Sequence, residues 1–176
     1  KRLIEIAEKD LGDVIYIPRL NYYFGTPIKG LGWGAIQDKI PRFFKKEYLS
    51  FSDKIHDFTD IKNNSKIYHI NNSEEGFIHF AYQTVDQLIN KINRYTTIEA
   101  KNQYEGKKKP LKSLFKLFFQ MIKVFVSMFF IKKGFKDKRK GLELSLIMSF
   151  YRLLTTMKYR LMNQYHTENY GIEIEK

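Results

Sequence analysis

The sequence predicts an α/β fold in which a region of short strands and loops precedes a set of amphipathic helices. Of the 176 residues, 43% are hydrophobic and 16% are aromatic, which suits one folded core and excludes a disordered or fibrous protein. Short β-branched and aromatic runs alternate with glycine and proline through about residue 82. From Thr84 onward, apolar residues recur at helical spacing, which predicts that the second half is helical.

The N-terminal residues predict the end of a helix, one short strand and two loops. Apolar residues at helical spacing precede Gly12, which we interpret as the helix stop. A strand from Val14 should end at Pro18, followed by an aromatic loop at 21–27. A glycine-rich loop at 29–44 then surrounds the only tryptophan. Its glycines lack the spacing of a phosphate-binding loop, so they predict no nucleotide site.

Strands give way to helices in the second half. Residues 61–75 are polar and turn-rich, and 76–82 form an apolar run that predicts a strand. Thr84, with Gln87 three residues later, forms a capping box for a helix at about 85–103. Two further helices are predicted at 111–131 and at about 141–163.

The predicted helix at 111–131 has one polar stripe on an otherwise apolar surface. The stripe follows steps of four, four, three and four residues through Lys112, Lys116, Gln120, Lys123 and Ser127. A lysine near the bilayer centre costs about 2.5 to 3.5 kcal/mol, so these three lysines disfavour a spanning helix. A helix lying in the membrane interface satisfies the pattern, with lysines toward headgroups and phenylalanines toward acyl chains. The alternative is that the apolar face packs on the protein's own core.

We therefore predict a membrane-binding face on this helix. It comprises Lys112, Lys116, Phe118, Phe119, Lys123 and Phe125.

The net charge of +12 is concentrated in one part of the chain. Residues 1–100 hold 14 Lys and Arg against 13 Asp and Glu, residues 101–162 hold 16 against 3, and the last 14 residues hold 1 against 3. This distribution divides the chain into a body at 1–106, a basic helical tail at 107–165 and a terminal segment at 166–176. A nearly neutral body with a basic, aromatic-rich tail favours an anionic membrane surface as partner. Nucleic acid is not expected, because the phenylalanines are not interleaved with the lysines as stacking platforms.

Two absences in the sequence narrow the chemistry. The chain contains no cysteine, which excludes disulfides, thiolate metal sites and cysteine nucleophiles. It begins at Lys1 within a helical pattern and without a secretory leader, so we expect upstream sequence to be missing.

A few polar and aromatic residues are candidates for binding or catalysis. His56 and Asp57 pair an imidazole with a carboxylate, which suits a general base or metal ligands. Arg42 can grip a phosphate, and Trp33 can stack on a sugar ring. The alternatives are an ion pair for Arg42, a buried anchor for Trp33 and a hydrogen-bonded core histidine for His79. The sequence has no Ser-His-Asp spacing, HExxH motif or EF-hand.

Seven short motifs follow one another between about residues 14 and 160. Together they resemble family 2 glycosyltransferases of the group that assembles lipopolysaccharide core and other cell-surface glycans. The motifs are Ile17-Pro18-Arg19-Leu20-Asn21-Tyr22, Gly25 with Ile28-Lys29 and Gly32-Trp33, Arg42-Phe43-Phe44, Ile55-His56-Asp57, Gly76-Phe77-Ile78-His79, Lys91-Ile92-Asn93-Arg94-Tyr95, and Phe129 to Gly134-Phe135 with Gly141-Leu142.

The resemblance implies that residues 1–106 are the C-terminal, acceptor-side portion of a GT-A fold. Such an enzyme moves a sugar from a nucleotide-sugar donor to a cell-envelope glycan or a lipid-linked acceptor. The family usually holds a divalent metal, Mg²⁺ or Mn²⁺, in an Asp-x-Asp motif. That motif and the nucleotide-binding half are not in this chain, so this piece alone is expected to be inactive. The implied location is the cytoplasmic face of the bacterial inner membrane, as a peripheral protein.

The same resemblance implies roles for individual residues. His56 and Asp57 would be catalytic, with His56 also a candidate metal ligand, although the family more often has Glu after this His. The substrate would be bound by Trp33, Asp38, Arg42 and His79. The alternative is a non-catalytic module that binds a membrane surface through the basic helical tail alone.

Overall fold

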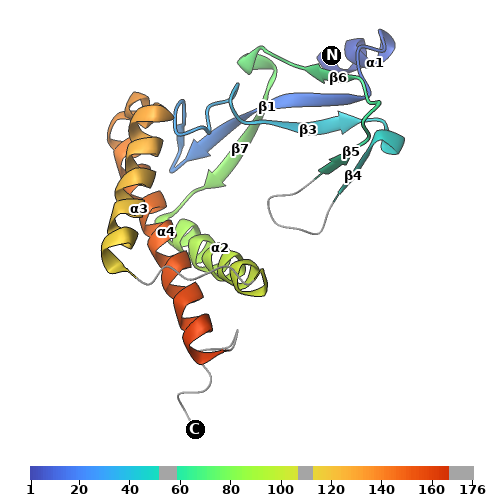
Figure 1. The fold of residues 1–176 in the computed structure, drawn as a ribbon. Helices are drawn as coiled ribbons and strands as arrows, with labels where there is room; N and C mark the ends of the chain where they lie inside the picture. Colours follow the sequence, from blue (N-terminus) through green and yellow to red (C-terminus); the bar gives the residue numbers. More distant parts are fainter. Residues whose placement is uncertain (52–58, 107–112, 167–176) are drawn as a thin grey trace. The chain divides into compact units, whose positions relative to one another are not determined.

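The computed structural model describes residues 1–51, 59–106 and 113–166, and it has the mixed α/β class that the sequence predicts (Figure 1). The chain forms two compact units. The first unit comprises Lys1–Ile28 and Trp33–Ala81, and the second comprises Lys29–Gly32 and the chain from Tyr82 onward. The strands belong almost entirely to the first unit and the long helices to the second.

Strand β1 (Val14–Tyr23) is the centre of the main sheet in the first unit. Its residues Val14–Tyr16 pair antiparallel with one strand and parallel with another, so these two strands flank β1 on opposite edges. The paired strands are β3 (Lys39–Phe44) and β6 (Ile67–His69), and β7 (Phe77–Tyr82) and β2 (Thr26–Pro27) also pair with β1. A separate two-stranded sheet is formed by β4 (Leu49–Phe51) and β5 (Thr59–Ile61).

The prediction that the first strand ends at Pro18 is wrong, because β1 continues through Pro18 to Tyr23. The Arg19 N–H donates to the Asp38 carbonyl beside β3, so the nitrogen of Pro18 faces the other edge of β1. There the pairing with β6 ends at Tyr16, so Pro18 interrupts no hydrogen bond between β1 and β6.

The expected aromatic loop at 21–27 is a β-hairpin. Its two central residues, Phe24 and Gly25, have φ values of 50° and 71°, as in a type I′ turn. Glycine adopts a positive φ without strain, whereas phenylalanine adopts it only with strain. Because Phe24 is an unfavourable residue for such a turn, the aromatic run does not indicate a tight turn.

The second expected loop, 29–44, ends in strand β3 rather than remaining irregular to Phe44. The register of β3 against β1 shifts between Ile15 and Tyr16, which pair with Phe43 and Pro41. Arg42 is therefore the extra residue of a β-bulge, and a proline is tolerated beside a bulge.

Helix α1 (Arg2–Glu8) packs on the sheet of the first unit. Its Ile6 is buried together with Ile15 and Ile17 of β1 and with Ile70. The sequence placed the helix stop at Gly12, but the helix ends earlier and Asp10 takes the left-handed conformation with φ of 47°. Gly12 is required for a different reason, since a Cβ there would lie 2.8 Å from the Cβ of Tyr68.

Ion pairs around α1 make the first unit sensitive to acid. Hydrogen bonds lower the pKa of Glu5 from 4.5 to about 2, and the bond from Lys9 has the largest effect, followed by the bond from Arg2. A hydrogen bond from Lys45, followed by the Lys66 N–H, lowers the pKa of Asp13. Both carboxyls have a lower pKa in the folded chain than in the unfolded chain. Their contribution to the stability of the folded unit is therefore complete above about pH 4.5, and it is lost as the pH falls toward 2.

We expect the free energy of unfolding of the first unit to fall as the pH is lowered from about 5 to about 2.5, because Glu5 has a pKa of 4.5 in the unfolded chain and about 2 in the folded chain. The fluorescence of Trp33, the only tryptophan, reports on this unit during urea unfolding. Glu5→Gln should reduce the loss, because the variant has no carboxyl to protonate at residue 5. An equal loss in Glu5→Gln and in the unaltered protein would contradict the assignment.

The second unit is built from α2 (Val85–Glu105), α3 (Leu114–Val126) and α4 (Lys138–Tyr165), with α4 packing on both other helices (Figure 1). The predicted cap of α2 is confirmed, because the Gln87 N–H donates to Thr84 Oγ1 at 3.2 Å. A π-helical turn (Ser127–Ile131) and a 3-10 turn (Gly134–Asp137) connect α3 to α4.

Lys158 ties α4 to α2. Its Nζ donates to the carbonyl and Oδ1 of Asn93 and to the hydroxyls of Thr96 and Thr97, at 2.7–2.8 Å. Burial lowers the pKa of Lys158. An ammonium has three hydrogens, so the four acceptors share them and leave no proton without a partner.

Residues 29–32 pack into the second unit at a tight junction of backbone. The Asp137 carboxylate accepts the N–H groups of Lys29 and Gly30 at 2.7 and 2.8 Å. Leu31 is fully buried, and its N–H donates to the Lys132 carbonyl at 2.7 Å. The glycines allow the close approach, since a Cβ on Gly30 would lie 2.1 Å from the Lys133 carbonyl oxygen.

Candidate functional site

Asn21 of β1 is the centre of a polar network in the first unit, and it is only 2% exposed. Its Nδ2 donates to Asp38 Oδ2 at 2.5 Å and to the Trp33 carbonyl at 2.9 Å, while its Oδ1 lies 2.8 Å from His79 Nδ1. The Asn21 network, which we define as Arg19, Asn21, Trp33, Asp38 and His79, therefore joins β1, β7 and the loop before β3.

Asp38 is held at a fixed position within this network. Its Oδ2 accepts hydrogen bonds from Arg19 Nε at 2.9 Å, from Arg19 Nη2 at 2.7 Å and from Asn21. The Asp38 side chain is 15% exposed, so most of its surface is shielded from water. Within the described residues, no hydrogen bond is made by its second oxygen, Oδ1. This oxygen can therefore accept a hydrogen bond from a hydroxyl group of a ligand.

The tautomer of His79 follows from the bonds of Asn21. Because Nδ2 of Asn21 donates to two acceptors, Oδ1 is the atom that faces His79, and His79 Nδ1 must donate to it. His79 is half-buried on β7, so the predicted alternative of a hydrogen-bonded histidine is right in its bonding and only partly right in its burial.

Trp33 stacks on Tyr23, with ring centroids 5.1 Å apart and an angle of 7° between the planes. Tyr23 is buried, whereas Trp33 is half-buried. The stacking covers one face of the indole, so a sugar ring can stack only on the opposite face. Trp33 thus acts as an anchor on one side, which was one of the two predicted roles.

Arg42 lies apart from the Asn21 network. It is exposed on the bulge of β3. Along the strand it lies roughly 10 Å beyond Lys39, the residue that follows Asp38 of the network. No residue in the described ranges forms an ion pair with it, so the predicted structural ion pair is not seen there. The bulge turns the side chain away from the regular alternation of β3.

His56 and Asp57, the predicted catalytic pair, lie outside the described residues, as does Lys112 of the predicted membrane-binding face. In the part of the chain that the structure describes, no group of three or more His, Asp or Glu residues can hold a metal ion. These described residues therefore supply no metal site of their own.

Arg19 and Asn21, the two residues that organise the site, are not among the predicted site residues. Both lie in the motif Ile17–Tyr22, which begins in the expected strand and ends in the expected loop at 21–27. Asn21 shares a face of β1 with Ile17 and Tyr23, and a polar residue at a buried position of a strand is the signal that would have identified it.

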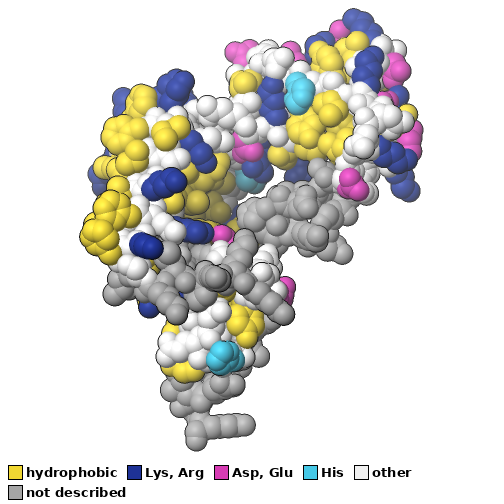
Figure 2. Space-filling model, viewed as in Figure 1, with side chains coloured by type: hydrophobic (Ala, Val, Ile, Leu, Met, Phe, Trp, Pro, Cys, Tyr) yellow, Lys and Arg dark blue, Asp and Glu magenta, His cyan; other side chains and the backbone are white. Residues whose placement is uncertain are grey.

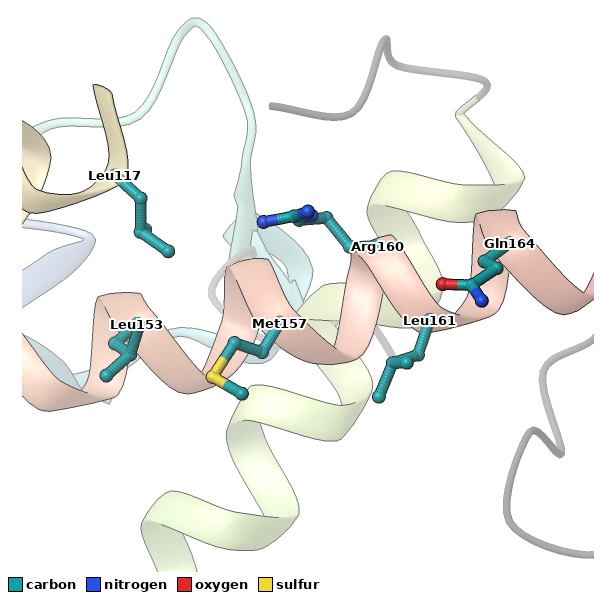
Figure 3. Close-up of a pocket in the computed structure, with 6 residues that line it drawn as sticks. All are labelled: Leu117, Leu153, Met157, Arg160, Leu161 and Gln164. Carbon is teal, nitrogen blue, oxygen red and sulfur yellow. The ribbon is translucent and has the colours of Figure 1, made fainter. Parts of the chain in front are cut away.

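A pocket of about 260 Å³ lies in the second unit (Figure 3). Figure 3 shows Leu117 of α3 facing the side chains of α4 that complete the wall. The pocket offers mainly hydrocarbon surface with one guanidinium, so it lacks the carboxylates that proton transfer in sugar chemistry requires. Its lining residues are Leu117, Leu153, Met157, Arg160, Leu161 and Gln164.

The described part of the predicted membrane-binding face lies on α3. Lys116, Phe118, Phe119 and Lys123 are exposed, and Phe125 is half-buried. No helix in the described ranges is both long enough and apolar enough to cross a membrane.

Comparison with known proteins gives relatives in the genus Rickettsia, each named an uncharacterized glycosyltransferase. The chain is 31% identical over 131 residues to one from Rickettsia prowazekii (strain Madrid E), covering 70% of this chain and 43% of the relative. It is 31% identical over 134 residues to one from Rickettsia bellii (strain RML369-C), covering 72% and 44%. A third, from Rickettsia felis (strain ATCC VR-1525 / URRWXCal2), is 30% identical over 131 residues, covering 70% and 44%.

The chain spans less than half the length of these curated relatives. No protein-family profile and no solved structure matches it. The relatives support a glycosyl transfer role in general, and their names specify neither donor nor acceptor.

Proposed function

We propose that this chain is the C-terminal, acceptor-side part of a family 2 glycosyltransferase with a GT-A fold. The complete enzyme transfers a sugar from a nucleotide-sugar donor to a cell-envelope glycan, in the lipopolysaccharide group, or to a lipid-linked acceptor. The observation that carries the proposal is the Asn21 network, taken together with relatives that are named as glycosyltransferases. We place the enzyme on the cytoplasmic face of the bacterial inner membrane, as a peripheral protein.

The chemistry of the Asn21 network suits a hydroxyl-rich ligand. Asp38 offers a carboxylate oxygen and Trp33 offers an aromatic ring whose face matches the C–H patch of a pyranose, and the bond of His79 to Asn21 keeps the imidazole beside them. Asn21 and Arg19 hold these groups in one geometry before a ligand arrives, which reduces the entropy lost on binding. We assign Asp38, His79 and Trp33 to acceptor binding.

The proposed reaction is an in-line displacement at the anomeric carbon of the donor sugar. Asp57, or a carboxylate upstream of this chain, removes the proton from the acceptor hydroxyl as its oxygen bonds to the sugar. The bond from the anomeric carbon to the nucleotide diphosphate breaks, and Arg42 stabilises the charge of the departing diphosphate. His56 precedes Asp57 in the sequence and is assigned to the same centre.

A divalent metal, Mg²⁺ or Mn²⁺, belongs to the proposal for the complete enzyme. When bound, such an ion would neutralise charge on the donor diphosphate. The described residues do not form a site that fits this ion, so we assign its ligands mostly to the part of the enzyme upstream of this chain. Within this chain, His56 is one candidate ligand.

Alanine substitutions in the full-length enzyme test the catalytic assignment. His56→Ala and Asp57→Ala should each lower kcat by about a hundredfold to ten-thousandfold, since a positioned base contributes about this much. The measurement is release of nucleoside diphosphate from a panel of nucleotide sugars with a cell-envelope acceptor extract. His69→Ala, an exposed histidine of the same unit, is the matched control and should retain its rate. Unchanged kcat in both variants at 56 and 57 would show that the assignment is wrong.

A further inference from the structure

The outward side of α3 and of the π-helical turn that follows is apolar. Seven large apolar side chains are exposed there, with exposed fractions from 39% for Val126 to 72% for Ile131. A helix on the surface of a soluble domain normally turns such residues inward and presents polar ones to water. The seven are Phe115, Phe118, Phe119, Ile122, Val126, Phe130 and Ile131, which we call the α3 apolar face.

This face lies opposite the side of α3 that packs in the second unit. At 100° per residue, Phe115, Phe119, Ile122 and Val126 fall within roughly 60° of one another. Leu117, which is only 3% exposed, points roughly 170° from the centre of that group. The helix therefore has two apolar sides, one buried against its own unit and one left open, so the core packing does not account for the second.

The charge around the α3 apolar face has one sign. From Gly106 to Lys136 the sequence contains nine lysines and no aspartate or glutamate. Lys116 and Lys123 are exposed and flank one edge of the face, roughly 80° to 100° from its centre. Lys132, Lys133 and Lys136 are exposed just beyond its C-terminal end. Figure 2 shows dark blue Lys and Arg side chains lying among the yellow hydrophobic side chains in the region of α3.

We propose that the α3 apolar face docks on the surface of an anionic lipid bilayer, with the axis of α3 parallel to the membrane plane. The phenylalanines enter the boundary between headgroups and acyl chains, and the lysines contact lipid phosphates. A second copy of the chain fits this surface poorly, because the same lysines would meet one another across the interface. This inference goes beyond the proposed glycosyl transfer and uses none of the residues assigned to sugar chemistry.

Vesicle flotation with the full-length protein tests the apolar part of the proposal. The probes are vesicles of phosphatidylcholine with one quarter phosphatidylglycerol, and vesicles of phosphatidylcholine alone. Phe118→Ser with Phe119→Ser should weaken binding to the anionic vesicles by at least about tenfold. The matched control is Leu146→Ser with Phe150→Ser on α4, which alters side chains of similar exposure, 54% and 45% against 58% and 55%. The control should bind within about twofold of the unaltered protein, since α4 is outside the proposed face.

The lysines are tested separately. Lys116→Gln with Lys123→Gln should weaken binding to the anionic vesicles by roughly tenfold or more, because each lysine near an anionic surface contributes about fivefold. Binding to the neutral vesicles should not change. Circular dichroism of each variant establishes that its helices are retained.

Three results would overturn the proposal. The first is wild-type binding by the Phe118 and Phe119 variant. The second is an equal loss by the α4 control, which would place the contact elsewhere. The third is a protein that is dimeric in solution and becomes monomeric in the Phe118 and Phe119 variant while vesicle binding is unchanged, which would assign the face to a second copy. Sugar transfer to a water-soluble acceptor, measured in parallel, separates these outcomes from failure of the proposed activity.

Discussion

Asp38→Asn in the full-length enzyme should lower kcat/KM for glycosyl transfer by about a hundredfold, with most of the effect in KM for the acceptor. The substitution keeps the shape of the side chain but removes the charge that Arg19 and Asn21 face at 2.5–2.9 Å. The amide oxygen can take the place of Oδ2 and accept from Arg19 and Asn21, so its NH₂ group takes the place of Oδ1. An NH₂ group only donates, so the position that we assign to accept from a ligand hydroxyl loses its acceptor, while Asn21 keeps its bonds to His79 and the Trp33 carbonyl.

Asp38→Ala adds a folding defect to the loss of activity. It leaves Arg19 and one of the two N–H groups of Asn21 Nδ2 without an acceptor, and each unsatisfied group costs about 1 to 3 kcal/mol. Urea unfolding followed by Trp33 fluorescence should show the first unit of this variant unfolding at lower urea concentration. Glu47→Ala removes an exposed carboxylate from the same unit and should change neither measurement. If Asp38→Asn retained wild-type KM and kcat, the Asn21 network would not be the acceptor site.

Local signals in the sequence were sufficient for the helical unit. The capping box at Thr84 and Gln87 predicts the start of α2, and the polar stripe through Lys116 and Lys123 predicts a helix where the structure has α3, with three of its phenylalanines exposed: Phe115, Phe118 and Phe119. These features depend on residues three or four apart, so they are present in the sequence before any tertiary contact forms.

The sheet was harder to predict, because its elements depend on partners far along the chain. A proline normally ends a strand, but Pro18 lies inside β1, with its nitrogen facing away from β3 and beyond the last residue paired with β6. Arg42 looked like a loop residue, but it is the extra residue of a bulge that exists only when β3 pairs with β1.

The candidate site shows the same limit. Trp33, Asp38 and His79 were selected individually from a resemblance, and the structure brings these three together. Their meeting point, Asn21, lies in β1, and the pairing of β7 with β1 is what brings His79 to it. No pattern of neighbouring residues encodes this 58-residue separation.

Gly141→Ala should lower the free energy of unfolding of the second unit by about 3 kcal/mol, at the upper end of what inserting a methyl group in a packed site costs. A Cβ at residue 141 would lie 1.8 Å from the Gly134 carbonyl oxygen, a backbone atom that cannot move as a flexible side chain can. Gly134 is itself confined, since its own Cβ would lie 2.7 Å from Leu31 and 2.8 Å from the Met128 carbonyl. Helix propensity acts in the opposite direction, because alanine is better than glycine inside a helix by about 1 kcal/mol. The backbone clash is the larger effect and decides the sign.

Gly106→Ala is the matched control, because it makes the same substitution in the same unit at a less crowded position. A Cβ there would lie 3.1 Å from the Asn102 carbonyl oxygen, so a small adjustment at the end of α2 relieves it. We expect a change of about 1 kcal/mol or less. Circular dichroism at 222 nm follows the helices of the unit during urea unfolding and compares both variants with the unaltered protein. Equal unfolding midpoints for Gly141→Ala and the unaltered protein would mean that the turn at Gly134–Asp137 can move away from α4. In that case the close contact between Gly134 and Gly141 would not be what fixes residues 29–32 against Asp137.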